Sequence, residues 1–440
     1  MFQRNFFTSI NWTRQLSAMR RFVFRRERLR PLLGICLLLL VVFLFCHVGR
    51  SPVPDLQKHL ALKLPPSIFL KLPSVSNNSF NKTIGLRERI EEKLSRNLAR
   101  STRVKPRKNM EKCLPIYGKV GVFVAVDEAS YDLTKRYAVA QESLRCYLKS
   151  TNYSFFYVNV DTDPRTLAEC KQKEVVFRKH CAASVYLRDV DWMLVLDADT
   201  GVVNPNHCIE EWIDDRVDMI FYERFYHFEI ACGNYLVRNT QQAHDFLVAY
   251  ADLGNVQYGQ FDASDNGRLL LHILRTVLPE ATEEIGACES IYREAKSFET
   301  YLKFVTCVKY TLGAVRVFPG VVRIYRRAHS WVRDYQLTNG FYGPNDFMMH
   351  SWKPSKVNFN DGGYEINVFK KMPDLEKCGT GGLNGWHFNP RYATSTEDIK
   401  RQLASYEQQT QQWFPKEARY LPFLIKPETA NCYPHCDVLT

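Results

Sequence analysis

Apolar runs alternate with amphipathic segments through the middle of the chain. Residues 120–127 (VGVFVAVD) and 154–161 (SFFYVNVD) are apolar runs that each end in Asp, which is typical of buried strands. Residues 137–150 between them have the apolar spacing of a helix, as do residues 177–187. A third apolar run follows at 191–200 (DWMLVLDADT). The alternation predicts an α/β fold with a sheet flanked by helices.

The N-terminus has a different pattern. Residues 31–48 contain no charged side chain, and a helix of 17 residues from Leu32 would span roughly 26 Å. Six arginines lie within residues 20–30, and this positive charge places residues 1–30 in the cytosol and the rest of the chain in the lumen. We therefore expect a single-pass type II anchor of the Golgi or endoplasmic reticulum. The alternative, a cleaved signal peptide, usually has a shorter basic region.

Charge is unevenly distributed along the chain. The net charge is +12, but residues 1–112 hold 23 Lys and Arg against 6 Asp and Glu, which leaves 36 against 41 for residues 113–440. The net charge of residues 113–440 is therefore about −5, and this charge does not indicate a basic groove that binds nucleic acid. Residues 49–112 are rich in Pro and cations, and we interpret them as a lumenal stem. Residues 113–440 would form the folded lumenal body.

Cysteine usage fits an oxidising lumen. Of the 13 cysteines, only Cys36 and Cys46 lie in the predicted anchor. The other eleven predict several disulfides and at least one thiol that is free or available for an intermolecular bond between copies of the chain. We expect Cys432 and Cys436 to join disulfides rather than a zinc site, because no second Cys/His pair lies at a useful spacing.

Two carboxylates follow the third predicted strand. In the stretch MLVLDADTGVVNP (193–205), Asp197 and Asp199 are one residue apart. Ligands of open α/β sheets bind beyond the carboxyl ends of the strands. Hard oxygen donors suit Mn²⁺ or Mg²⁺ that also binds a diphosphate. The pair could instead cap a turn, or Asp197 could be the nucleophile of a haloacid-dehalogenase-type phosphatase, although that motif normally opens its domain.

These residues carry a resemblance to a known family. The stretch 192–205 and the elements before it resemble the Rossmann-like nucleotide-sugar half of a GT-A glycosyltransferase. They are similar in particular to the galactosyltransferase family of fungal mannan and plant xyloglucan synthesis, and to a nematode-expanded family of uncharacterised relatives. Residues 231–240 (ACGNYLVRNT), 263–274 (ASDNGRLLLHIL) and 346–353 (DFMMHSWK) resemble later landmarks of that family, in the same order.

The resemblance implies a metal-dependent transferase. It would move a hexose, with galactose the first to try, from a UDP-sugar to a glycan or glycoprotein acceptor, with retention of anomeric configuration. Asp197, Asp199 and the neutral imidazole of His350 would bind Mn²⁺ or Mg²⁺, and Lys353 would meet the diphosphate. The same letters His-Ser-Trp begin at His329, so that residue is an alternative ligand; we prefer His350 because a lysine follows its copy of the motif.

Five more residues receive roles from the resemblance. Arg178 and Lys179 would face the diphosphate or the uracil, and Asn234 would line the donor or acceptor sugar. Asp265 or Asn266 would contact the donor sugar or the attacking hydroxyl. Four of them have a structural alternative: surface cations for Arg178 and Lys179, a buried strand amide for Asn234, and a helix N-cap for Asp265.

The remaining features are less specific. Glu223 and Glu229 would lie near the active face. We interpret the Gly-rich stretch 379–391 as an ordered surface loop or an acceptor-site lid, and the segment from Ser395 as a capped amphipathic helix. An alternative from another class is a non-catalytic lumenal protein that binds sugar on a transferase scaffold.

Overall fold

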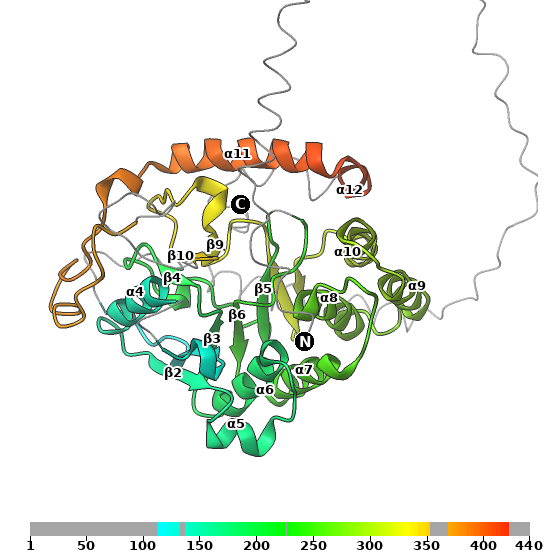
Figure 1. The fold of residues 1–440 in the computed structure, drawn as a ribbon, viewed down its shortest axis with the longest axis horizontal. Coiled ribbons are helices and arrows are strands. Elements are labelled where there is room, and N and C mark those ends of the chain that lie inside the picture. The colour runs from blue at the N-terminus through cyan, green and yellow to red at the C-terminus, as the bar shows by residue number, and fades with distance from the viewer. Residues whose placement is uncertain (1–111, 133–136, 226, 353–367, 422–440) are drawn as a thin grey trace, which may run out of the picture. The chain divides into compact units, whose positions relative to one another are not determined.

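The computed structural model describes residues 112–132, 137–225, 227–352 and 368–421, all of which belong to one compact unit, residues 77–440 (Figure 1). Within these ranges, no helix combines the length and apolar character needed to cross a membrane. The predicted tail 1–30, anchor 31–48 and almost all of the stem lie outside the described residues, as do Lys353, Cys432 and Cys436.

A seven-stranded mixed sheet forms the centre of this unit, in the order β2-β1-β3-β6-β5-β8-β7 (Figure 1). The pairs β1–β2, β1–β3 and β5–β8 are parallel. The pairs β3–β6, β5–β6 and β7–β8 are antiparallel. The strands are β1 (Val120–Val126), β2 (Ser154–Asn159), β3 (Trp192–Leu196), β5 (Met219–Tyr222), β6 (Tyr235–Arg238), β7 (Val317–Phe318) and β8 (Val322–Tyr325).

A second sheet of three short strands lies next to the end of β3. It has the order β4-β10-β9, with β4 (Gly201–Val202), β9 (Val332–Asp334) and β10 (Met348–His350). β10 runs antiparallel to β4 and parallel to β9. Because β4 begins five residues after β3 ends, this pairing brings residue 350 back to the carboxyl end of β3.

Two apolar clusters cover opposite faces of the main sheet. Phe123 and Ala125 of β1 belong to one cluster, while Val122 and Val124 belong to the other, as the alternation of side chains in a strand requires. Helices α6 to α10 cover the first face, and α4, the small sheet and the C-terminal segment cover the second. The helices are α4 (Ala138–Leu148), α5 (Pro164–Glu169), α6 (Val175–Leu187), α7 (Gln241–Asp252), α8 (Ser264–Val277), α9 (Thr282–Arg293), α10 (Phe298–Leu312), α11 (Thr396–Trp413) and α12 (Pro415–Tyr420).

The predicted α/β pattern agrees with these elements. The three predicted strands correspond to β1, β2 and β3, and the two predicted helices correspond to α4 and α6. Their ends differ by at most two residues, except that β3 ends at Leu196, four residues before the end of the predicted run. The short helix α5 was not predicted. It begins with Pro164 at its first position, and the Asp163 side chain accepts a hydrogen bond from the Thr166 amide at 2.8 Å.

Disulfides tie the elements together, as predicted. The four bonds are Cys113–Cys208, Cys146–Cys378, Cys170–Cys181 and Cys288–Cys307. Cys232 is a buried free thiol. The bond from Cys146 joins α4 to the segment that carries the Gly-rich loop, so it spans a large part of the body.

The C-terminal helix α11 begins where its capping residue predicts. Ser395 is the N-cap, and its hydroxyl accepts a hydrogen bond from the Asp398 amide at 3.1 Å. Ile399 and Leu403 are fully buried in a separate apolar cluster. The helix therefore packs on the body through its apolar face, in agreement with the amphipathic pattern.

Candidate metal centre

A tight turn follows β3 and presents the two carboxylates. The Thr200 amide donates to the Asp197 carbonyl at 3.0 Å. The side-chain oxygen of Asn234 accepts from the Asp197 amide at 3.1 Å and from the Thr200 hydroxyl at 2.8 Å, while its amide group donates to the Tyr222 hydroxyl at 3.2 Å. Asn234 is fully buried directly before β6, and its side chain holds the turn through these hydrogen bonds.

The small sheet brings His350 to this turn. Met349 pairs with Gly201 across β10 and β4, and the Trp352 amide donates to the Asp199 carbonyl at 2.9 Å. As a result, the His350 Nε2 atom lies 3.4 Å from an Asp197 oxygen and 3.4 Å from an Asp199 oxygen. Residues separated by about 150 positions in the sequence therefore meet through strand pairing.

Asp197, Asp199 and His350 form a group that can hold a metal ion. Each offers one ligand atom, and these three atoms lie within 4.8 Å of one another. The structure thus groups the two carboxylates with His350 and not with His329, within the residues it describes. A second such group includes Cys113 and Cys208, but their sulfurs are joined in a disulfide.

The surroundings of the carboxylates fit a divalent cation. Two carboxylates and an imidazole are a donor set that suits Mn²⁺ and accepts Mg²⁺. Gly233 makes room for this arrangement: a Cβ atom at that position would lie 1.9 Å from an Asp197 oxygen. The glycine therefore allows the backbone of the neighbouring chain segment to approach the first carboxylate.

Asp334 orients His350 from behind. Its register partner in the parallel β9–β10 pair is His350, and its carboxylate lies 2.6 Å from the imidazole Nδ1. Asp334 is buried and lies 3.5 Å from the Arg224 guanidinium. A carboxylate on Nδ1 leaves Nε2 directed at the metal position, which is the usual arrangement of a metal-binding histidine. The sequence contained no local signal for Asp334, because only strand pairing places it there.

Opposing charges set the protonation of the cluster. Burial alone would lower the pKa of His350, but Asp199, Asp197 and Asp334 raise it to about 10. Burial would raise the pKa of Asp197, but Lys179 and His350 together hold it well below its usual range. Without a metal, the imidazole is therefore protonated between carboxylates. A metal ion has to displace that proton.

Lys179 completes the cluster. Its ammonium lies 2.8 Å from one Asp197 oxygen, and the side chain is nearly buried on α6. Burial would lower the pKa of Lys179, but Asp197 and Asp265 raise it above its ordinary value. The lysine is therefore charged and occupies one oxygen of Asp197, while the other oxygen faces His350.

Arg178, the neighbour of Lys179 on α6, points to a different place. Its guanidinium donates to Asp161 at 2.7 Å and to the Gln172 carbonyl at 2.7 Å. These bonds tie α6 to the end of β2 and to the loop before the helix. The structure therefore brings Lys179 into the carboxylate cluster and engages Arg178 with protein partners.

Asp265 and Asn266 lie behind Lys179, in the first turn of α8. An Asp265 oxygen is 3.7 Å from the His180 Nε2 atom, and the Asn266 side-chain oxygen accepts from the Cys232 amide at 3.4 Å. Burial would raise the pKa of Asp265, but His180 and Lys179 lower it. The structural alternative for Asp265, a helix N-cap, is wrong, because the N-cap of α8 is Ala263 in a left-handed conformation.

Glu223 and Glu229 are buried in ion networks and not in the cluster. Glu223 pairs with Lys309 and Arg316, and its pKa is lowered to about 2 because these cations outweigh the effect of burial. Glu229 accepts from the Tyr301 hydroxyl at 2.6 Å. Both carboxylates therefore connect the sheet with α10 and the segment after it.

Comparisons with known proteins found one match to a family model and two distant structural likenesses. A family model described as "Protein of unknown function, DUF273" matches residues 144–362. No curated protein matches the chain. A glycosyltransferase involved in the glycosylation of the major capsid of PBCV-1 is 14% identical over 53% of this chain and 93% of its own, with a TM-score of 0.32. A mannosyltransferase from Pyrobaculum calidifontis, in complex with GDP-Man and Mn²⁺, is 11% identical over 49% of this chain and 76% of its own, with a TM-score of 0.24. At such scores, neither likeness carries the assignment.

Proposed function

We propose that this protein is a metal-dependent glycosyltransferase that moves a hexose from a nucleotide-sugar to a glycan or glycoprotein acceptor. The supporting observation is the meeting of Asp197, Asp199 and His350 at the carboxyl end of β3. In α/β sheets this edge is where ligands bind, and the donor set suits a cation that grips a diphosphate. UDP-galactose is the first donor to try, and retention of anomeric configuration is the expected outcome.

The residues of the cluster have distinct tasks in this proposal. Asp199 and His350 would hold the cation, and Asp197 would do so with the oxygen that does not meet Lys179. When bound, Mn²⁺ or Mg²⁺ neutralises charge that develops on the diphosphate leaving group. Lys179 holds Asp197 in place, because its ammonium is already within hydrogen-bond distance.

The donor side has further candidates. Lys353 comes three positions after His350, the last residue of β10, and lies outside the described residues. We keep it as a candidate point charge for the diphosphate. Arg178 would have to leave Asp161 to reach a donor. Asn234 supports the turn, while Asp265 and Asn266 remain candidates for a contact with the donor sugar. The proposed compartment is the Golgi or endoplasmic reticulum lumen, behind a type II anchor.

Two other functions are weaker. A phosphatase of the haloacid-dehalogenase type needs a free Asp197 oxygen to attack phosphorus, but one oxygen meets Lys179 and the other faces His350. A non-catalytic sugar-binding protein would keep the cluster and lack transfer. Turnover of a donor therefore distinguishes the proposed transferase from the non-catalytic sugar-binding protein.

The test is donor hydrolysis by the purified full-length protein with a panel of UDP- and GDP-sugars. We expect one donor to release sugar with Mn²⁺, and we expect release to stop with EDTA. Asp199→Ala should lower the rate at least about a hundredfold. Asp245→Ala on the exposed face of α7 is the matched control and should keep the wild-type rate. Metal-dependent donor binding without turnover, even with glycan acceptors added, would favour the non-catalytic alternative.

A further inference from the structure

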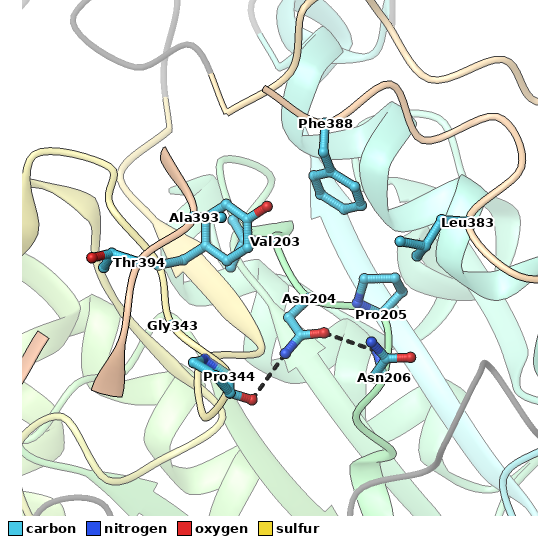
Figure 2. A pocket seen from close by; sticks show the side chains of 11 residues that line it. Val203, Asn204, Pro205, Asn206, Gly343, Pro344, Leu383, Phe388, Ala393 and Thr394 are labelled. Carbon is cyan, nitrogen blue, oxygen red and sulfur yellow. Dashed lines mark hydrogen bonds between the residues drawn. The ribbon is translucent and has the colours of Figure 1, made fainter. Parts of the chain in front are cut away.

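A separate pocket lies at the other end of the β4–β10 pair. Its volume is about 550 Å³, which is in the range of small-ligand sites (Figure 2). It lies between the turn after β4, the turn before β10, and the C-terminal segment that contains the Gly-rich loop. Its lining includes Asn204, Asn206, Tyr342, Leu383, Phe388 and Thr394.

The pocket has a rigid aromatic wall. Phe388 is half-buried and stacks on the fully buried Trp386 with ring centroids 5.2 Å apart and an interplanar angle of 4°. Tyr342 lies 6.0 Å from Phe388, centroid to centroid. Leu383 is 51% exposed and lines the same pocket, which extends the apolar surface. Figure 2 shows Phe388 and Leu383 across the opening from Pro344.

Uncharged polar groups lie beside this wall. The Asn204 side chain donates to the Pro344 carbonyl at 3.0 Å and accepts from the backbone amide of Asn206 at 3.2 Å (Figure 2). No described residue hydrogen-bonds the side-chain amide of Asn206 or the hydroxyl of Tyr342. None of the residues that line the pocket is charged. A diphosphate or another strongly charged ligand would find no counter-charge here.

The combination of flat apolar surface and neutral hydrogen-bonding groups matches one class of ligand. A pyranose ring has an apolar face of C–H groups and a rim of hydroxyls, each of which can donate and accept. The C–H face can stack on an aromatic ring, while amide and phenol groups pair with the hydroxyls. A purely apolar ligand would cover these two polar groups without offering them a hydrogen-bond partner, which has a free-energy cost.

The pocket is distinct from the metal cluster. The amides of Val203 and Asn204 donate to the Phe347 carbonyl at 2.9 and 3.2 Å, so the strand pair that holds Asp199 continues to the pocket. None of Asp197, Asp199 and His350 lines the pocket, and Asn204 comes five positions after Asp199, at most about 17 Å along extended chain. A disulfide from Cys378 to α4 anchors the segment that carries Leu383 and Phe388.

We propose that this pocket binds one ring of a neutral carbohydrate, with the ring stacked on Phe388 and its hydroxyls paired with Asn206 and Tyr342. The proposal goes beyond the transferase function, because binding here requires neither the metal nor a nucleotide-sugar.

The test is saturation-transfer NMR on the full-length protein in EDTA. The probes are the neutral disaccharides mannobiose, lactose and cellobiose, with digalacturonic acid as the charged comparison. We expect transfer to the ring protons of at least one neutral disaccharide and none to the charged one. Phe388→Leu and Asn206→Ala should each weaken binding about tenfold. The matched control, Trp413→Leu, changes an exposed aromatic of α11 outside the pocket and should bind as wild type.

The outcomes are distinct from those of the transferase test. Loss of disaccharide binding in Asn206→Ala, with an unchanged melting temperature, supports the pocket even if no donor turns over. Absence of binding to all three neutral disaccharides would overturn the proposal. Binding that neither pocket variant changes would place the sugar elsewhere and would overturn it too. If Phe388→Leu does not fold, Asn206→Ala decides alone.

Discussion

The two ends of the β4–β10 pair have opposite chemistry. One end carries Asp199 and His350 among buried charges, each held by an opposite charge or a fixed hydrogen bond. The other end carries a pocket whose lining is uncharged and partly aromatic. Ordered charges suit a cation and a diphosphate, whereas stacking and amide groups suit a neutral ring. One short strand pair can thus separate two ligand chemistries, because each end is covered by different parts of the chain.

The largest effect is expected for Lys179→Met at the charged end. Removal of the buried Lys179 leaves the buried Asp265 and the partly exposed Asp197 without their shared cation, so the free energy of unfolding should fall by about 3 kcal/mol or more. Urea denaturation measures this change. Lys171→Met, at an exposed position, is the control. A second substitution, Asp197→Asn, should restore part of the loss; a change below about 1 kcal/mol in the single variant would contradict a buried pair.

The next effect concerns the pocket end. Replacing Cys146 and Cys378 with Ser removes the disulfide that anchors the Gly-rich segment, and should lower stability by about 2–4 kcal/mol. Limited proteolysis should then cut first near residues 379–385, because this loop loses its nearest covalent tie. Mn²⁺ binding should persist in the folded fraction. Equal loss of metal binding would show that the two ends are not separable.

A smaller effect is expected for Asp334→Asn. The amide can still accept or donate at His350 Nδ1, but it removes the charge that directs Nε2 to the metal. We expect Mn²⁺ affinity to fall about 10- to 100-fold, measured by calorimetry, with little change in fold. Asp346→Asn would be a poor control because Asp346 is buried with Arg333; Asp215→Asn, which is half-exposed, serves instead. Unchanged affinity would remove Asp334 from the metal centre.

The smallest effect is a pH dependence at the charged end. The pKa of His350 is raised to about 10, above the ordinary value of 6.5. Its contribution to the stability of the metal-free protein is therefore fully present below pH 6.5 and is lost as the pH rises through 10. Because Mn²⁺ displaces the proton, affinity should rise about tenfold or less between pH 6.5 and 7.5. His350→Gln should abolish this slope, whereas a slope that persists in the variant would assign it to another group.

Local patterns predicted much of the fold. The strands β1, β2 and β3 and the helices α4 and α6 follow from apolar periodicity, because that periodicity reports which face of each element is buried. The capping residue Ser395 marked the start of α11. By contrast, α5 was not predicted, since six residues are too few to establish a helical period.

The candidate site was predicted in part. Asp197 and Asp199 are one residue apart in the sequence, and the apolar run before them marks the end of a strand. In the sequence, we preferred His350 to His329 as the metal ligand because a lysine follows its motif. In the structure, the pairing of β10 with β4 is what brings His350 to the carboxylates. Arg178 and Lys179 looked equivalent as letters. Their different roles depend on the direction in which each leaves α6: Lys179 reaches Asp197, and Arg178 reaches Asp161.

The sequence by itself predicted the first three strands, the helices α4, α6 and α11, the presence of several disulfides, and the position of the acidic pair after a buried strand. Only the tertiary structure decided that His350 and its partner Asp334 complete the centre, that Gly233 makes room for Asp197, and that a neutral pocket forms at the other end of the strand pair. The physical reason is that periodicity records local burial, whereas contacts between residues far apart in the chain depend on strand register and on which segments cover each end of the sheet.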